Sequence, residues 1–245
     1  MTDSTGADEE RLVTGYSGRL LLAVSVGWGL IQSGRLVISP LLPAISTDLG
    51  LSSTRAGAAI SVLWGLYALL QYPSGRLSDR LSRKTLLVGG LGLLCVGFGT
   101  LATAPTYLVF LVGAAVVGLG AGLYPTPARG LVSDLFVTRR GQAFGLHTAS
   151  GDLGGVVAAG LATLVLAVAT WRAAFLPVVV VIVAVAVALH RWNHESYVVG
   201  RVDMAVADTG RRLLGEPRLR WLLVSYSLYA RSEEHTSELQ SPSAI

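Results

Sequence analysis

Long apolar runs recur along this chain, and each is close to the length needed to cross a lipid bilayer. A helix rises about 1.5 Å per residue, so about 20 apolar residues span the roughly 30 Å of hydrocarbon. Hydrophobic residues make up 52% of the sequence and charged residues only 14%, whereas about a quarter of residues are charged in soluble domains. The sequence therefore predicts an all-α membrane protein with six spans, at 20–42, 56–72, 85–103, 107–128, 143–169 and 173–189.

The remaining segments divide the chain further. Residues 1–19 are acidic at their start and lack the basic-then-apolar order of a cleaved signal peptide, so the first span is expected to stay as an anchor. Residues 190–220 are polar and are expected to form a linker, and the apolar run at 221–230 to be a stump of a seventh helix. Residues 231–241 resemble the translation of a sequencing-adapter oligonucleotide, so 231–245 are expected to be non-native; the alternative is a natural polar tail.

The basic residues are distributed unevenly between the two sides of the expected spans. Of the 19 lysines and arginines, only Arg55 and Arg172 fall in loops on one side; Arg35 lies within the first span and Arg231 in the tail. The positive-inside rule then places the N-terminus, the even-numbered loops and the linker in the cytoplasm. This pattern predicts a multi-pass protein of the cell membrane and explains the net charge of +4 without a nucleic-acid partner.

A charged ten-residue run, 75–84, is enclosed by two apolar stretches. It resembles the signature loop of the major facilitator superfamily, in which Gly, Asp and three basic residues have fixed spacing. The chain matches that loop at Gly75, Asp79, Arg80, Arg83 and Lys84, and it has Ser82 where the family usually has Gly.

Further segments share the resemblance: 34–43 is similar to the end of a family first helix, 118–122 and 133–141 to the fourth helix and its exit, and 171–175 to the start of the sixth. The resemblance implies the N-terminal half of a fold with two six-helix halves, each built of 3+3 inverted repeats. Substrate then binds near the midplane between the halves. The missing C-terminal half becomes an expected partner.

Two charged residues inside expected spans are the main candidates for a binding site, because an ionisable group in a membrane span is costly unless it is paired, hydrated or functional. We expect Asp152 to bind a proton or the substrate, and Arg35 to be its counter-ion or an anchor for an anionic substrate. The alternatives are snorkelling for Arg35 and a structural contact for Asp152. Weaker candidates are His147 as a proton relay, and cavity- or gate-facing Gln32, Trp64, Tyr67, Gln71, Tyr124 and Arg129.

The resemblance also implies a conformational role for the signature loop. In relatives its Asp, here Asp79, caps a helix of the other half, and its Arg, here Arg83, pairs with an acidic residue at the end of the fourth helix. That residue would be Asp134, and the pair is expected to stabilise an outward-facing state. The alternative is a solvated basic loop.

Glycines spaced four apart predict close helix packing. Gly118 and Gly122 share one helix face, as do Gly151 and Gly155, and small residues at this spacing let a neighbouring backbone approach. A rocking surface between helices is the functional alternative to static packing.

These features favour a secondary transporter of a small solute, working by alternating access with a coupled proton or other ion. The alternative is a non-transporting six-helix binding or scaffold module, or a homodimeric half-transporter. The sequence contains no Walker-type phosphate loop, His-Glu-x-x-His cluster or nucleophile with a base partner, so neither an enzyme nor a cofactor is expected. Cys95 is the only cysteine, which excludes an internal disulfide.

Overall fold

The computed structural model describes residues 10–200 together with 211, 215–217, 221 and 225. The chain divides into two units, 1–202 and 203–245. Most of the expected seventh-helix stump, about half of the linker and the whole tail at 231–245 lie outside the described residues. In residues 10–200 all regular structure is helical: α2 (Gly15–Leu36), α3 (Ile38–Leu49), α4 (Ser53–Ser78), α5 (Arg83–Ala102), α6 (Tyr107–Leu123), α7 (Pro125–Leu135), α8 (Arg140–Val168), the 3-10 helix η1 (Trp171–Ala174) and α9 (Phe175–Trp192).

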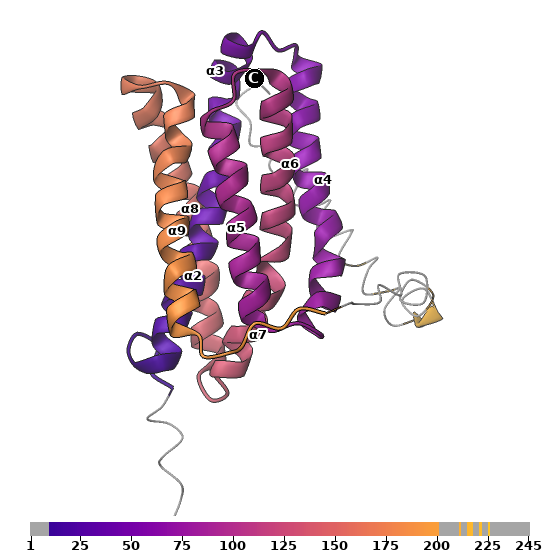
Figure 1. The fold of residues 1–245 in the computed structure, drawn as a ribbon, viewed down its shortest axis with the longest axis vertical. Coiled ribbons are helices and arrows are strands. Elements are labelled where there is room, and N and C mark those ends of the chain that lie inside the picture. The colour runs from indigo at the N-terminus through magenta and orange to yellow at the C-terminus, as the bar shows by residue number, and fades with distance from the viewer. Residues whose placement is uncertain (1–9, 201–210, 212–214, 218–220, 222–224, 226–245) are drawn as a thin grey trace, which may run out of the picture. The chain divides into compact units, whose positions relative to one another are not determined.

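These helices form the expected bundle (Figure 1). Five stretches of the described residues are long and apolar enough to span a membrane: Gly15–Leu49, Arg83–Ala102, Tyr107–Leu135, Arg140–Val168 and Trp171–Trp192. The remaining expected span is α4, which has 26 residues but carries Arg55, Gln71 and Arg76. Its polar residues explain why it falls outside the group of apolar spans.

The first and fourth spans extend past the predicted boundaries, because each continues as a second helix after a break. α2 ends at Leu36 and α3 begins at Ile38, close to Pro40 and Pro43. Proline lacks an amide donor and restricts the preceding backbone, so it interrupts regular helical hydrogen bonding.

The break in the fourth span has a similar cause. Pro125 occupies the first helical position of α7, a place where its missing N–H costs nothing. α7 therefore restarts the helix after Tyr124 and carries it to Leu135.

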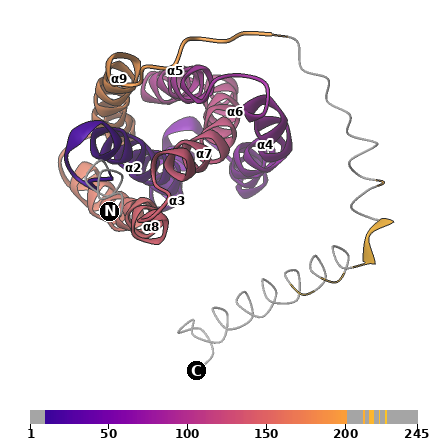
Figure 2. The ribbon, with the colours of Figure 1, turned by 90° about the horizontal axis from the view of Figure 1, so that it is seen from below.

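The packing relates the first three spans to the last three. α2 packs against α8, and α6 packs against α4, so the first helix of each triplet contacts the second helix of the other. α5 and α9, the third members, also pack together. Figure 2 looks along the helices and shows α4 beside α6 and α8 beside α2. This reciprocal contact pattern is what two inverted three-helix repeats produce.

Glycines allow the α4–α6 contact to be close. A Cβ on Gly118 would collide with the carbonyl oxygen of Leu63, and one on Gly122 would lie 2.8 Å from the carbonyl oxygen of Tyr67. Both glycines of this predicted pair thus face the backbone of α4.

The α2–α8 contact uses glycines in the same way, with one difference from the prediction. A Cβ on Gly151 would collide with the indole of Trp28, as expected for a packing residue. Gly155 would place a Cβ only 3.6 Å from a methyl of Leu36, which is an ordinary contact. Gly154 makes the close approach instead, because its Cβ would collide with the carbonyl oxygen of Gly29.

Candidate functional site

Arg35 is buried near the end of α2, with 4% of its surface exposed. Its guanidinium carbon lies 4.1 Å from the ring centre of Tyr67, 4.6 Å from that of Trp64 and 6.0 Å from that of Trp28. Its Nη2 donates to the side-chain oxygen of Gln32. Three of the expected site residues, Gln32, Trp64 and Tyr67, therefore contact Arg35 directly. We call these five residues the Arg35 cluster.

The guanidinium in this cluster has unused hydrogen-bonding capacity. Nε and Nη1 of Arg35 are buried and have no hydrogen-bond partner in the described part of the chain. Aromatic faces attract a cation but accept no conventional hydrogen bond, and a buried unsatisfied donor is costly. Trp64 is 40% exposed, so the cluster reaches the surface of the bundle through α4. Arg35 is thus a buried cation with two unpaired donors, and it lies beside the partly exposed ring of Trp64.

The burial of Arg35 corrects two expectations from the sequence. A snorkelling arginine would extend its guanidinium to the membrane interface, whereas this one folds onto aromatic rings inside the bundle. The structure also does not pair Arg35 with Asp152, which is exposed on α8 and makes no ion pair within the described residues. The expectation that Arg35 anchors an anion stays a prediction.

His147 lies on α8 beside the same cluster. It is buried, its ring stacks on Trp28 with 6.1 Å between centres, and its Nδ1 has no partner in the described residues. Trp28 therefore contacts both Arg35 and His147. The structure brings His147 toward the cluster but leaves Asp152 on an exposed face of its helix.

Tyr124 does not face a cavity, and this expectation is corrected. Its side chain is fully buried, and its hydroxyl donates to the carbonyl oxygen of Val24 at 3.0 Å. The ring packs where Gly27 leaves room on α2. Tyr124 is therefore a packing residue whose hydrogen bond links the start of α7 to α2.

Gln71 and Arg129 lie away from the Arg35 cluster, in a cavity at the end of the bundle that carries the signature loop. This cavity has a volume of about 640 Å³ and lies between α4 and α7. Gly75, Asp79 and Arg83 also line it, so the loop forms part of its wall.

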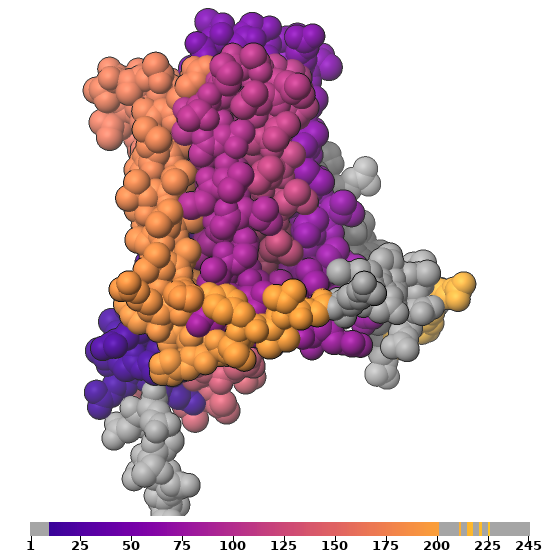
Figure 3. Space-filling model, viewed as in Figure 1, coloured from indigo at the N-terminus to yellow at the C-terminus, as the bar shows by residue number. Residues whose placement is uncertain are grey.

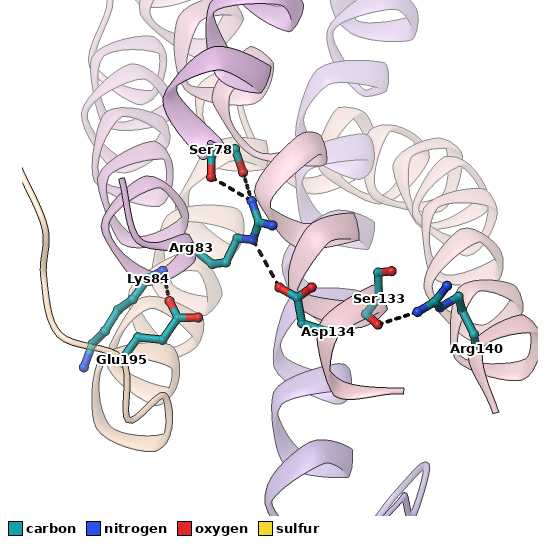
Figure 4. Close-up of polar contacts among 7 residues, drawn as sticks. All are labelled: Ser78, Arg83, Lys84, Ser133, Asp134, Arg140 and Glu195. Carbon is teal, nitrogen blue, oxygen red and sulfur yellow. Dashed lines mark hydrogen bonds and ion pairs between the residues drawn. The ribbon is translucent and has the colours of Figure 1, made fainter. Parts of the chain in front are cut away.

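Arg83 connects the loop to the neighbouring helix α7. Its Nε lies 3.4 Å from Oδ2 of Asp134, and its Nη1 donates to the carbonyl oxygen of Ser78 at 2.8 Å and to the Ser78 hydroxyl (Figure 4). A Cβ on Gly130 would be 2.7 Å from the guanidinium carbon, so this glycine provides the space for Arg83. The structure thus places Arg83 and Asp134 together; Asp79 and Arg80 are exposed.

Ser82 caps the helix that follows the loop. Its φ is −67° and ψ 149°, an extended conformation that requires no glycine. Its hydroxyl accepts a hydrogen bond from the amide of Thr85 at 3.2 Å, as an N-cap serine does. The family's usual glycine at this place is replaced by a residue that starts α5.

Lys84 is not a solvated loop residue. It is 8% exposed, and its Nζ donates to the carbonyl oxygen of Asn193 at 2.8 Å. Its amide donates to the carboxylate of Glu195 at 3.0 Å. The segment after α9 crosses the start of α5, as the orange band in Figures 1 and 3 shows. Lys84 therefore ties the loop to this segment, a contact that sequence spacing could not reveal.

The carboxylate of Glu10 links the N-terminal segment to the turn before α8, at the same end of the bundle as the signature loop. Glu10 accepts hydrogen bonds from the amides of Val137, Thr138 and Arg139 and from the Thr138 hydroxyl, at 2.6 to 3.2 Å. These hydrogen bonds lower the pKa of Glu10 from its ordinary 4.5 to about 2, and the bond from the Thr138 hydroxyl has the largest effect. The ionised carboxylate thus stabilises the turn that leads into α8.

The opposite end of the bundle has its own polar network. Arg172 places Nη1 2.7 Å from the carboxylate of Asp48 and donates through Nε to the carbonyl oxygen of Ala104 at 2.9 Å. The indole of Trp171 also donates to Asp48 at 3.2 Å. The contacts join α3, the α5–α6 connection and η1. The sequence indicated Arg172 for orientation and for the resemblance at 171–175, but not for this structural role.

Trp28 is the member of the Arg35 cluster that sequence reasoning missed. Residues 28, 32 and 35 recur at helical spacing on one face of α2, as residues 64 and 67 do on α4. This spacing was the sequence signal that could have identified Trp28.

No group of three His, Cys, Asp or Glu side chains that could hold a metal occurs in the described residues.

Comparison with known proteins agrees with this fold. The profile of the Major Facilitator Superfamily matches residues 23–230. A gentisate transporter of Corynebacterium glutamicum is 32% identical over 171 residues, which cover 67% of this chain and 38% of that protein. A probable sulfoacetate transporter of Cupriavidus necator is 29% identical over 148 residues, which cover 58% of this chain and 33% of that protein. The chain thus spans less than half the length of these relatives.

Among solved structures, a bacterial homologue of the human lysosomal transporter Spinster superposes with a TM-score of 0.69 at 19% identity, over 83% of this chain and 50% of that one. This likeness shows the fold alone. Because the family profile matches most of the sequence, the chain belongs to the Major Facilitator Superfamily.

Proposed function

We propose that this chain forms one wall of the solute pathway of a secondary transporter that carries small organic anions by alternating access. The observation that supports the anion is Arg35, a buried guanidinium whose Nε and Nη1 lack partners in the described residues. A carboxylate or sulfonate would accept one hydrogen bond from one of these donors and one from the second hydrogen of Nη2, and such two-point pairing is the strong form of arginine recognition.

The aromatic neighbours of Arg35 refine the substrate class. Cation–π contacts of Trp28, Trp64 and Tyr67 hold the guanidinium in place before an anion arrives. The exposed edge of Trp64 offers an apolar surface for the rest of the solute. Two relatives are named for gentisate and sulfoacetate, both of which are small organic acids. These features favour a small organic acid over a sugar or a cation.

Ligand titration of the purified chain tests this class. Trp28 and Trp64 contact Arg35, so their fluorescence reports binding once Trp171, Trp192 and Trp221 are replaced by Phe. Gentisate should quench this fluorescence saturably, and the neutral amide of the same ring should not. Equal quenching by the acid and the amide would refute recognition of an anion.

The transport cycle requires a second six-helix unit to close the pathway, and we propose the missing C-terminal half as that partner. A second copy of this chain is the alternative. Light scattering of the purified chain separates the two: a monomer requires a different partner, whereas a stable dimer favours a homodimeric half-transporter.

We propose proton coupling through Asp152, with His147 as a relay beside Trp28. Asp152 is exposed on α8, and His147 contacts the ring that also contacts Arg35. In proteoliposomes that contain both units, Asp152→Asn should abolish the pH dependence of uptake. An unchanged pH dependence would remove Asp152 from the coupling mechanism.

We also propose that the chain lies in the plasma membrane with its N-terminus in the cytoplasm. The excess of arginine and lysine at the end that carries 75–84 supports this orientation. Single cysteines introduced near Arg139 and near Arg55, in a Cys95→Ala background, should react with an impermeant maleimide in intact cells only at the Arg55 position. The reverse labelling pattern would invert the orientation.

A further inference from the structure

A pocket with two arginines in its lining lies where the start of α2 meets the end of α9. It has a volume of about 270 Å³ and is lined by Gly15, Tyr16, Arg19, Arg191, Trp192 and His194. Tyr16 and His194 shape one wall: their rings stack with 4.7 Å between centres, and the His194 amide donates to the Tyr16 hydroxyl at 3.4 Å. The pocket is therefore a formed feature of the bundle with two arginines in its lining.

The two arginines have no carboxylate partner in the described part of the chain. Neither of the ion pairs found there involves Arg19 or Arg191. The nearby carboxylates are engaged elsewhere, Glu10 with the turn before α8 and Glu195 with the amide of Lys84. The pocket thus presents two positive charges that this part of the protein does not neutralise.

An apolar groove adjoins the pocket and runs along the same two helices. It has a volume of about 340 Å³, and its lining contains no charged residue: Leu22, Ala23, Val26, Ala184, Val185, Ala188 and Trp192. Trp192 lines both spaces. On α2 the lining continues from Arg19 to Leu22, Ala23 and Val26 at helical spacing, and on α9 it passes from Trp192 to Ala188 and Ala184.

The pocket and the groove together resemble the layered chemistry of a phospholipid, which has a charged headgroup followed by apolar chains. Charge lies at the helix ends, a half-exposed tryptophan at the junction, and aliphatic side chains deeper in the expected span. Tryptophan prefers the interface between headgroups and acyl chains, and basic residues beside a membrane surface attract anionic lipids. Ala184 and Ala188 leave the room that an acyl chain would fill.

We infer that Arg19, Arg191 and Trp192 bind one anionic phospholipid, with its phosphate between the arginines and an acyl chain in the α2–α9 groove. This site is separate from the Arg35 cluster, and its occupancy does not depend on the transported solute. Because α2 and α9 belong to different triplets of the bundle, the bound lipid would hold them together.

Native mass spectrometry of the full chain with added lipids tests this site. Phosphatidylglycerol should bind more tightly than phosphatidylcholine with the same acyl chains. In Arg19→Gln/Arg191→Gln the affinity for phosphatidylglycerol should fall about 25-fold, or about fivefold per arginine, to the level of phosphatidylcholine. The matched control, Arg139→Gln/Arg140→Gln, removes the same charge from the start of α8 and should leave the affinity within about twofold. An equal loss in both double variants would refute the site, because only total charge would then matter.

A second pair of variants tests the groove without changing charge. Ala188→Trp would fill it and should weaken binding of phosphatidylglycerol, whereas Val187→Trp, on the exposed neighbouring face, should not. Circular dichroism checks that both variants keep their helices. Retention of full binding in Ala188→Trp would contradict an acyl chain in the groove, and inorganic phosphate binding as tightly as the lipid would reassign the pocket to a soluble anion.

Discussion

Gly29 of α2 and Gly154 of α8 lie in direct backbone contact. A Cβ on Gly154 would collide with the carbonyl oxygen of Gly29, and a Cβ on Gly29 would be 2.7 Å from the carbonyl oxygen of Ser150. Since neither backbone can yield easily, we predict that Gly154→Ala costs about 1–3 kcal/mol by overpacking.

Gly160 provides the control for this prediction, because a Cβ there meets no atom within 4 Å. Gly160→Ala should be neutral or stabilise the helix by up to about 1 kcal/mol. Reversible unfolding in mixed detergent micelles measures both variants. Equal stability of Gly154→Ala and Gly160→Ala would show that the helices separate at little cost, as the rocking-surface alternative requires.

Arg83 and Asp134 should be coupled energetically, because their contact joins the loop before α5 to α7. Both side chains are partly exposed, so we expect a coupling energy of only about 0.5 kcal/mol in a double-mutant cycle with alanine. In a transporter assembled with its second unit, Asp134→Arg should slow uptake and Arg83→Asp should partly restore it. Strictly additive losses would assign the contact to a solvated basic loop.

Ser82 offers a test of the helix start that replaces the family's usual glycine. Because its hydroxyl accepts from the Thr85 amide, Ser82→Ala should cost about 1 kcal/mol, and Ser82→Gly only a few tenths. The free energy of unfolding of both variants checks this order. A larger loss for Ser82→Gly than for Ser82→Ala would mean that the hydroxyl does not cap α5.

Glu10 should make the turn before α8 sensitive to acid. Its folded pKa is about 2 and its ordinary value 4.5, so the carboxylate contact is fully present above about pH 4.5 and is lost as the pH falls toward 2. Glu10→Gln should remove the contact at neutral pH. Hydrogen exchange at Thr138 and Arg139 should then be faster in the variant; unchanged exchange would contradict the contact seen here.

The fold was largely predictable from the sequence because membrane spans carry a strong local signal. The lengths of the apolar runs located each long helix of the described residues, and the 75–84 motif indicated the family. The extended first and fourth spans were missed because the run of apolar residues ends before the helices do: α3 continues through Thr47 and Asp48, and α7 through Ser133 and Asp134.

The candidate site was less predictable because it depends on contacts between distant helices. Sequence reasoning singled out Arg35 by its charge, but its aromatic enclosure by Trp28 and Trp64 depends on how α2 meets α4. It assigned Tyr124 to the cavity because an exposed and a packed tyrosine look alike in sequence. It also chose Gly155 rather than Gly154, since a four-residue spacing defines a helix face only to within one residue.

The affinity of Arg35 variants for a small organic acid tests the central claim most directly. With the fluorescence of Trp28 and Trp64 as readout, Arg35→Gln should weaken gentisate binding about 30-fold or more, because the buried anion loses its charged partner. Arg35→Lys should bind with intermediate affinity, since an ammonium cannot pair at two points, and Arg139→Gln should bind as the unchanged chain does. If Arg35→Gln instead binds gentisate as tightly as the unchanged chain, Arg35 is not the anchor and the proposed substrate class is wrong.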